Sequence, residues 1–180
     1  MRSFQDSDIQ TFAAYRSEPD VAKYQSWDAP YPIEQATNLV KAVRATQPGT
    51  VGEWYQVALE RKEGNELIGD CAFHILADEP QQAEIGYTLA SKYQGYGYAT
   101  EAVTRLLDYL FGELNLHRVR ATCDVDNLAS SKLLERIGMR REAHFVENIW
   151  FKGQWGSEYL YALLRSEWIL SSDSASNIFS

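Results

Sequence analysis

The chain has 180 residues, 45% of them hydrophobic and 23% charged, which are ordinary values for one globular domain and exclude disordered and fibrous classes. The net charge of −8, without any run of lysine and arginine, argues against a nucleic acid partner. No apolar run approaches the roughly 20 residues that span a bilayer, and residues 1–10 lack the pattern of a signal peptide, so we expect a cytoplasmic protein without a membrane partner.

The first part of the chain is predicted to hold two helices with an aromatic loop between them. Asp6-Ser7-Asp8 can cap a helix over residues 9–16, which Pro19 then interrupts. Apolar residues at helical spacing predict the second helix over residues 33–46. The loop, residues 24–32, either packs onto the core or lines a substrate pocket. We take three of its aromatic residues as substrate-binding candidates: Tyr24, Trp27 and Tyr31.

The pattern then changes to the period of two that is typical of strands. Alternation predicts strands over residues 54–61, 66–75 and 83–89, with turn residues between them. Strands joined by such short turns favour an antiparallel meander. The strongest helical pattern in the chain follows over residues 99–114, and its apolar stripe must pack against a sheet.

The C-terminal part is predicted to add a strand over residues 117–125, a helix over 127–137 and a hairpin that runs from 145 to 164. Because strand, helix and strand follow one another around residues 83–125, we expect a parallel crossover within the otherwise antiparallel sheet, and therefore an α+β fold. One domain should cover residues 1–169. Residues 170–180 are small and polar, so we expect a frayed tail.

The turn between the third strand and the strongest helix carries the clearest chemical signal. Glycine adopts backbone angles that are forbidden to other residues, so Gly95 and Gly97 can turn successive N–H groups into one concavity. The helix that follows adds its unpaired amides and the positive end of its dipole. Such a turn can bind a pyrophosphate without a basic side chain. A dinucleotide fold is disfavoured, because Thr100 stands where its fingerprint requires a third glycine.

These residues resemble a known family. Gln94-Gly95-Tyr96-Gly97-Tyr98-Ala99 resembles the acetyl-CoA motif of the GNAT acetyltransferases, Gln/Arg-x-x-Gly-x-Gly/Ala, whose amides hold the CoA pyrophosphate. Residues 127–139 resemble the downstream Asn-x-x-Ser element that flanks the pantetheine arm. Residues 83–89 are similar to the strand that precedes the acetyl-CoA motif. Residues 150–155 are similar to the C-terminal hairpin of one subgroup, the ribosomal-protein N-terminal acetyltransferases of the RimJ/RimL type.

The resemblance implies a GNAT-type sheet with helices on both faces, and acetyl-CoA as co-substrate with no metal. The sequence departs from the family pattern in three places: the first strand is reduced to Arg2-Ser3-Phe4, Met139 replaces the usual aromatic residue, and Leu134 stands where many relatives carry a tyrosine that acts as general acid. The residues expected to bind the cofactor are Tyr87, Thr88, Leu89, Gln94, Gly95, Tyr96, Gly97, Tyr98, Ala99, Thr100, Asn127 and Ser130.

The implied reaction is direct attack of a neutral amine on the acetyl thioester, which requires a base and an acid. Glu84 is the candidate base, and the alternative for it is a solvated or salt-bridged strand carboxylate. Ser130 is the candidate acid, given Leu134, while Asn127 can cap its helix, contact the pantetheine, or do both. Cys123, like Cys71, lacks the spacing of a metal site or disulfide, so a buried reduced thiol is favoured over an acyl-cysteine route.

The acceptor is expected to be a small-molecule or peptide amine. A protein N-terminus, a polyamine, an antibiotic and a metabolite amine all fit the pattern. The leading hypothesis is an N-acetyltransferase, and the alternatives are a CoA-binding module without catalysis and a nucleotide-binding interaction domain. An exposed C-terminal hairpin could also pair across a homodimer.

Overall fold

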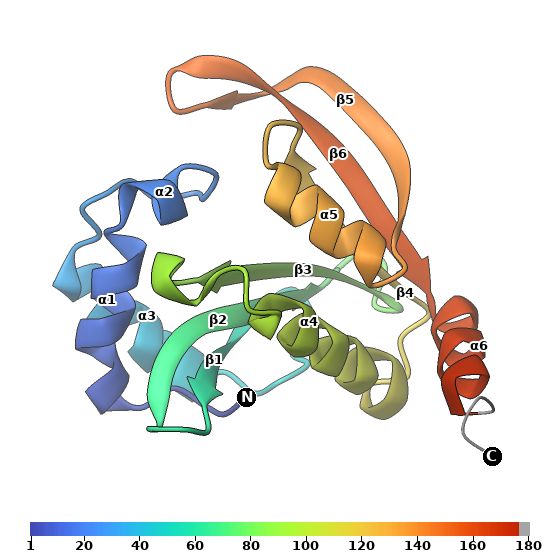
Figure 1. Cartoon of the computed structure of the whole chain (residues 1–180), viewed down its shortest axis with the longest axis horizontal. Coiled ribbons are helices and arrows are strands. Elements are labelled where there is room, and N and C mark those ends of the chain that lie inside the picture. The colour runs from blue at the N-terminus through green and yellow to red at the C-terminus, as the bar shows by residue number, and fades with distance from the viewer. Residues whose placement is uncertain (177–180) are drawn as a thin grey trace.

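Six strands form one mixed sheet in the order β1-β2-β3-β4-β6-β5 in this computed structural model, which describes residues 1–176, the last six of them by backbone alone (Figure 1). The strands are β1 Trp54–Arg61, β2 Glu66–Ile75, β3 Gln82–Leu89, β4 Arg118–Asp124, β5 Arg140–Phe151 and β6 Gln154–Leu164. Neighbouring strands are antiparallel except β3 and β4, which are parallel. The predicted α+β fold with a central parallel crossover is therefore confirmed.

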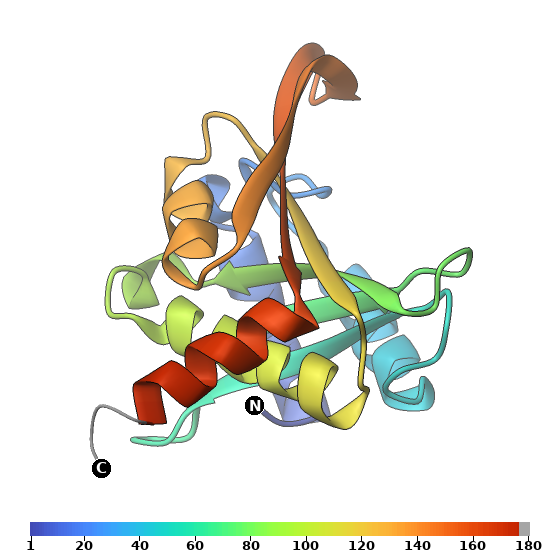
Figure 2. The ribbon, with the colours of Figure 1, turned by 90° about the vertical axis from the view of Figure 1, so that its right-hand side faces the viewer.

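Helices cover both faces of this sheet. They are α1 Ile9–Arg16, α2 Pro19–Ala22, α3 Ile33–Ala45, α4 Tyr98–Asp108, α5 Leu128–Arg136 and α6 Arg165–Ser176. Tyr15 of α1 bonds to Asp70 of β2, whereas Tyr109, just after α4, packs on Phe73 of the same strand. Side chains three positions apart on a strand point to opposite faces, so α1 and α4 lie on opposite sides of the sheet (Figures 1 and 2).

The predicted apolar stripe of α4 forms the centre of the core. Val103, Leu106 and Leu107 are fully or almost fully buried, as are Leu110 and Phe111 beyond the end of the helix. The sequence predicts one α-helix up to residue 114, but the α-helix ends at Asp108. A π-helical turn over Tyr109–Glu113 follows, in which the Leu114 N–H donates to the carbonyl of Tyr109 at 3.0 Å.

Two helices were not predicted from the sequence. Pro19 begins α2 instead of only interrupting the preceding helix, because proline fits the first turn of a helix, where its missing N–H has no partner to lose. Helix α6 follows β6 directly and runs to Ser176, into the segment expected as a tail. Residues 177–180 of that tail lie outside the described residues. No helix within residues 1–176 is long and apolar enough to cross a membrane.

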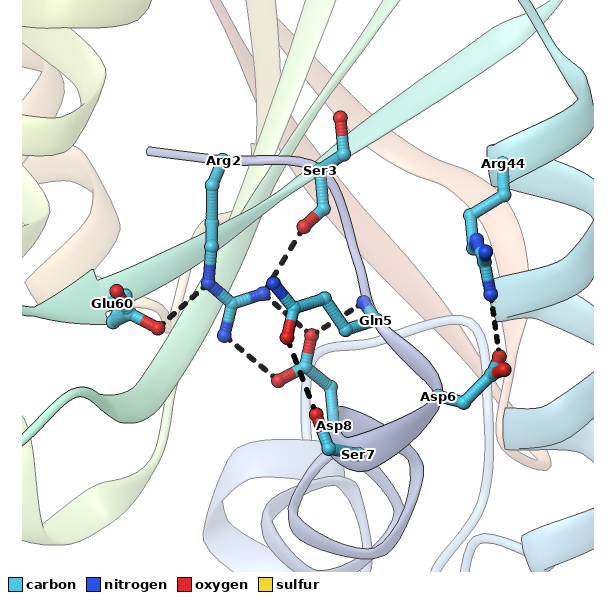
Figure 3. Close-up of polar contacts among 8 residues, drawn as sticks. All are labelled: Arg2, Ser3, Gln5, Asp6, Ser7, Asp8, Arg44 and Glu60. Carbon is cyan, nitrogen blue, oxygen red and sulfur yellow. Dashed lines mark hydrogen bonds and ion pairs between the residues drawn. The ribbon is translucent and has the colours of Figure 1, made fainter.

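The short first strand is held at the edge of β1 by ion pairs. Arg2 forms a two-bond bridge with Ala58 of β1, and its guanidinium contacts both Asp8 and Glu60 at 2.7 Å (Figure 3). Asp8 also accepts a bond from the Gln5 N–H at 2.7 Å, so it serves the helix start and the edge contact together. The segment thus stays attached to β1 although it adds only one bridge to the sheet.

Candidate active site

The candidate site begins where β3 and β4 separate. Their pairing covers only three residues of each strand, from Gln82 opposite Arg118 to Glu84 opposite Arg120. Beyond that point β3 remains paired with β2, and β4 with β6. A gap therefore opens between the C-terminal halves of β3 and β4 (Figure 1).

Backbone groups of β3 are turned into this gap. The bonds from the Leu76 N–H to the Gln82 carbonyl and from the Ala90 N–H to the Ile68 carbonyl, both 3.0 Å, place the even-numbered residues of β3 in bonded pairs with β2. By the alternation of an antiparallel ladder, the N–H and C=O groups of Tyr87 and Leu89 point the other way. The Leu89 carbonyl accepts a bond from Nε2 of Gln94 at 3.0 Å. An extended ligand lying in the gap could pair with the N–H groups as an added strand.

The turn that leads to α4 lies at the same end of β3. Gly95 and Gly97 have φ angles of +83° and +87°, which side-chain-bearing residues rarely adopt. The first bond inside α4 runs from the Glu101 N–H to the Gly97 carbonyl at 3.0 Å, and within residues 1–170 no side chain caps this end of the helix. The amides of the first helical turn are thus free to bind an anion. Arg136 adds positive charge, with Nη1 3.5 Å from Oγ1 of Thr100.

A tyrosine and a serine meet on the α5 side of the gap. The hydroxyl of Tyr87 lies 2.6 Å from Oγ of Ser130, near the start of α5. The Asn127 side chain accepts a bond from the Ser130 N–H at 3.2 Å, which confirms its predicted role as the helix cap. Burial raises the pKa of Tyr87 above its ordinary value, although its bond to Ser130 opposes the shift. Tyr87 therefore keeps its proton and can donate to Ser130, which leaves the serine proton for another acceptor.

Comparison with known proteins identifies the family. Residues 1–140 match the family model described as an acetyltransferase (GNAT) domain. The chain is a GNAT acetyltransferase. An uncharacterized N-acetyltransferase of Bacillus subtilis, YnaD, is 36% identical over 168 residues, which cover 93% of this chain and 94% of that protein. The prediction of an N-acetyltransferase enzyme is thereby confirmed, and the hypothesis of a module without catalysis is not supported.

Other acetyltransferases resemble the chain over different lengths. The ribosomal protein uS5-alanine N-acetyltransferase of Escherichia coli is 28% identical over 118 residues, which cover 65% of this chain and 61% of that enzyme. A GNAT acetyltransferase from Bacillus anthracis superposes with a TM-score of 0.81 at 34% identity, covering 92% and 94% of the two chains. Vibrio cholerae spermidine N-acetyltransferase, solved with CoA and spermine, gives 0.79 at 22% identity over 93% and 96%, so it shares the fold.

Glu84, the candidate base of this GNAT enzyme, lies in an ion pair. Its Oε2 accepts bonds from Nη2 and Nε of Arg120 at 3.0 and 3.2 Å. The salt-bridged alternative considered for Glu84 therefore describes its state in the structure. Strand alternation directs Glu84 to the face covered by α1 and Tyr87 to the face covered by α5. The two candidate catalytic groups, Glu84 and Ser130, thus lie on opposite sides of the gap.

The three predicted substrate residues in the aromatic loop of this GNAT enzyme lie in two different environments. Trp27 and Tyr31 surround the buried guanidinium of Arg16, whose Cζ lies 3.8 and 5.2 Å from their ring centres. Trp27 also donates from Nε1 to the Arg16 carbonyl at 3.1 Å. Tyr24 instead extends across to the turn after β4, where its hydroxyl donates to the carbonyl of Asp126 at 3.1 Å. Packing onto the core thus accounts for Trp27 and Tyr31, and Tyr24 borders the gap.

A buried polar cluster beneath α1 was missed in the sequence. Asp70 is 2% exposed and accepts bonds from Tyr15, from Gln56 at 2.7 Å and from Arg16 at 3.4 Å. Asp70 pairs in register with Thr88 of β3, so the cluster supports the strand that borders the gap. A signal was present, because a carboxylate inside an otherwise apolar strand is rare without a buried partner.

The two cysteines are free and buried. Burial raises the pKa of the Cys123 thiol, while bonds to Ser131 and Ser130 lower it by a smaller amount. Little thiolate is then present at neutral pH, which disfavours an acyl-cysteine route. Within the part of the chain that the structure describes, no three His, Cys, Asp or Glu side chains are grouped as a metal site requires.

Proposed function

We propose that this enzyme transfers an acetyl group from acetyl-CoA to a primary amine by direct attack in a ternary complex. The observation that carries the proposal is the gap between β3 and β4, which is bordered by the N–H groups of Tyr87 and Leu89 and leads to the free amides at the start of α4. A ligand with an extended amide-bearing arm and a pyrophosphate fits both features. We assign the arm to Tyr87, Leu89 and Asn127, with Thr88 between the first two bonded to β2, and the pyrophosphate to residues 94–100.

The cofactor assignment rests on chemistry that the residues already provide. Amides of an extended strand can pair with the amides of a pantetheine arm, and the amides of Tyr98, Ala99 and Thr100 can bond phosphate oxygens. Bound acetyl-CoA would supply an acetyl group activated as a thioester. Arg136 lies close enough to Thr100 to add charge complementarity to the same region.

The two faces of the gap suit the two proton transfers of the reaction. We place the acceptor amine on the α1 face, near Glu84, and the departing sulfur on the α5 face, near Ser130. Because Arg120 engages Glu84, Glu84 acts through a water molecule or after Arg120 releases it. An α-amine, with a pKa of about 7.7–8.0, needs less help from a base than a lysine at about 10.4.

The acceptor we favour is the N-terminal amine of a peptide. Support comes from partial-length similarity to an enzyme that acetylates a ribosomal-protein alanine, as in the RimJ/RimL subgroup. The second candidate is a polyamine, because an enzyme of the same fold was solved with spermine.

We place the enzyme in the cytoplasm, where ribosomal proteins and reduced thiols occur. The exposed indoles of Trp150 and Trp155 favour pairing of the hairpin with a second copy, which sedimentation equilibrium would test.

The experiment is a panel of amines incubated with acetyl-CoA and enzyme, with release of the CoA thiol as readout and mass spectrometry of the product. The panel contains peptides with free and blocked N-termini, spermidine and a lysine derivative. We expect thiol release with free N-termini, and acetylation of the α-amine. Release with spermidine alone would transfer the assignment to polyamines. Tight CoA binding without turnover of any amine would contradict the proposal.

A further inference from the structure

The tip of the β5–β6 hairpin carries a lysine in an unusual backbone conformation. Phe151 pairs with Gln154, so Lys152 and Gly153 form a two-residue turn, with φ angles of +48° and +86°. Such turns require positive φ at both positions and are most often Asn-Gly or Gly-Gly. A lysine there is strained relative to asparagine or glycine. Backbone strain of this kind commonly accompanies a functional contact.

The side chain of Lys152 makes that contact with the aromatic loop. Its ammonium donates to the carbonyls of Ala22 and Trp27, both at 2.7 Å, and lies 3.4 Å from the carboxylate of Asp28. One cation thus bonds both ends of residues 22–28, which we term the acceptor strap. In Figure 1 the hairpin tip lies above α2, and the contact joins positions 125 and 130 residues apart.

The acceptor strap also contacts both sides of the gap. Tyr24 donates to the Asp126 carbonyl, in the turn after β4, at 3.1 Å. Gln25 extends toward β3, and its Nε2 lies 3.5 Å from the carbonyl oxygen of Tyr87. Because β3, the turn after β4 and the hairpin each contact the strap, the strap lies across the mouth of the gap, with the Gln25 amide beside the backbone groups assigned to the cofactor.

We propose that Lys152 is a positioning residue that fixes the acceptor strap over the gap, and that Gln25 is the strap side chain presented to the incoming amine. The inference rests on the proposed function, because it assigns the strap to acceptor binding. The hairpin then has a role in catalysis although it lies outside the gap, and a linear amine must pass beneath the strap to reach the thioester.

The decisive variant is Lys152→Asn, because asparagine is favoured in this turn and cannot bridge both carbonyls. We expect an unchanged or raised melting temperature, faster deuterium uptake at the amides of residues 22–28, and an acceptor KM that rises roughly tenfold. The KM for acetyl-CoA should stay within about twofold. Lys152→Arg, which retains the cation, should restore most of the slow deuterium uptake and most of the low acceptor KM. Gln25→Ala should raise the acceptor KM but change strap exchange less than Lys152→Asn does, because Lys152 still bonds both ends of the strap.

The control is Lys62→Asn in the β1–β2 turn, which should behave as wild type. Unchanged deuterium uptake of the strap in Lys152→Asn would refute the role of Lys152 in fixing the strap, whatever the activity of the variant. Faster uptake with an unchanged acceptor KM would show that the strap is no part of the acceptor site. If wild type acetylates no amine, the proposed function fails, while the exchange measurement still decides whether Lys152 holds the strap.

Discussion

Gly97 is the residue on which the proposed pyrophosphate site depends most. It precedes α4 with a φ of +87°, and a Cβ built on it would contact nothing within 4 Å. Space is therefore available for a side chain, and the constraint at this position is the backbone angle alone. A substitution should act by changing where the amides of α4 point and not by steric exclusion.

We predict that Gly97→Ala raises the KM for acetyl-CoA roughly tenfold, because a left-handed alanine costs about 1–2 kcal/mol and the helix start shifts to relieve it. Steady-state kinetics at saturating acceptor would measure this. Gly112→Ala is the matched control, since its Cβ also meets nothing and its φ is not positive. Equal KM values for the two variants would contradict the assignment.

A second residue-scale prediction concerns Tyr87 and Ser130. Ser130→Ala removes the proposed proton donor for the departing sulfur and should lower kcat by roughly 10²-fold. Tyr87→Phe leaves Ser130 in place but without the bond that orients it, so we expect a smaller loss of kcat with unchanged KM for acetyl-CoA. Steady-state assays of thiol release would give kcat and the KM for acetyl-CoA of both variants. A larger loss for Tyr87→Phe than for Ser130→Ala would reverse the two roles.

At the scale of elements, regular periodicity was predictable and long-range pairing was not. The strands over residues 54–61 and 66–75 have the predicted bounds because local alternation determines them, and the helix over 9–16 has them because of the residues that flank it. Helix α2 is only four residues long, too short for a helical period to be recognised. The contacts of Asp70 with Arg16, and of Lys152 with the strap, join positions far apart in sequence, where no local pattern reports them.

An ion network joins three elements at the far edge of the sheet. Glu142 of β5 bonds Arg118 of β4 and Arg140, and Arg140 also pairs with Glu167 of α6. The Arg118 guanidinium, followed by Arg140, lowers the pKa of Glu142 to about 2. An acid with a lowered pKa stabilises the fold above its unfolded pKa of about 4.3, and this stabilisation is lost as pH falls toward 2.

We therefore predict that Glu142→Gln lowers the free energy of unfolding at pH 7 by about 0.5–1 kcal/mol, a modest value because these side chains are partly exposed. Urea unfolding at several pH values would measure it. The difference from wild type should shrink between about pH 4.3 and pH 2, and also at high salt. The exposed Glu63→Gln serves as control. A difference that stays constant down to pH 2 would exclude this network as the cause.

At the scale of the whole molecule, one gap organises the proposed function. The glycine turn before α4 was predictable because Gly95 and Gly97 lie two positions apart in the sequence, as was the Asn127 cap. Of the proposed acceptor side, Tyr24 was predicted from the aromatic loop but its neighbours were not, because this side combines the strap at the end of α2, the end of β3, the turn after β4 and the hairpin tip. Only the folded chain brings these four segments together, so Gln25 and Lys152 were absent from the predicted site.

The central claim is direct transfer between two substrates held together across this gap. Initial rates of thiol release, measured over a grid of acetyl-CoA and acceptor concentrations, test it most directly. The account predicts intersecting double-reciprocal lines, with no acetyl group retained on the enzyme after incubation with acetyl-CoA alone. Parallel lines together with an acetylated Cys123 would contradict it, because they would require a covalent intermediate on a thiol that the structure keeps buried and protonated.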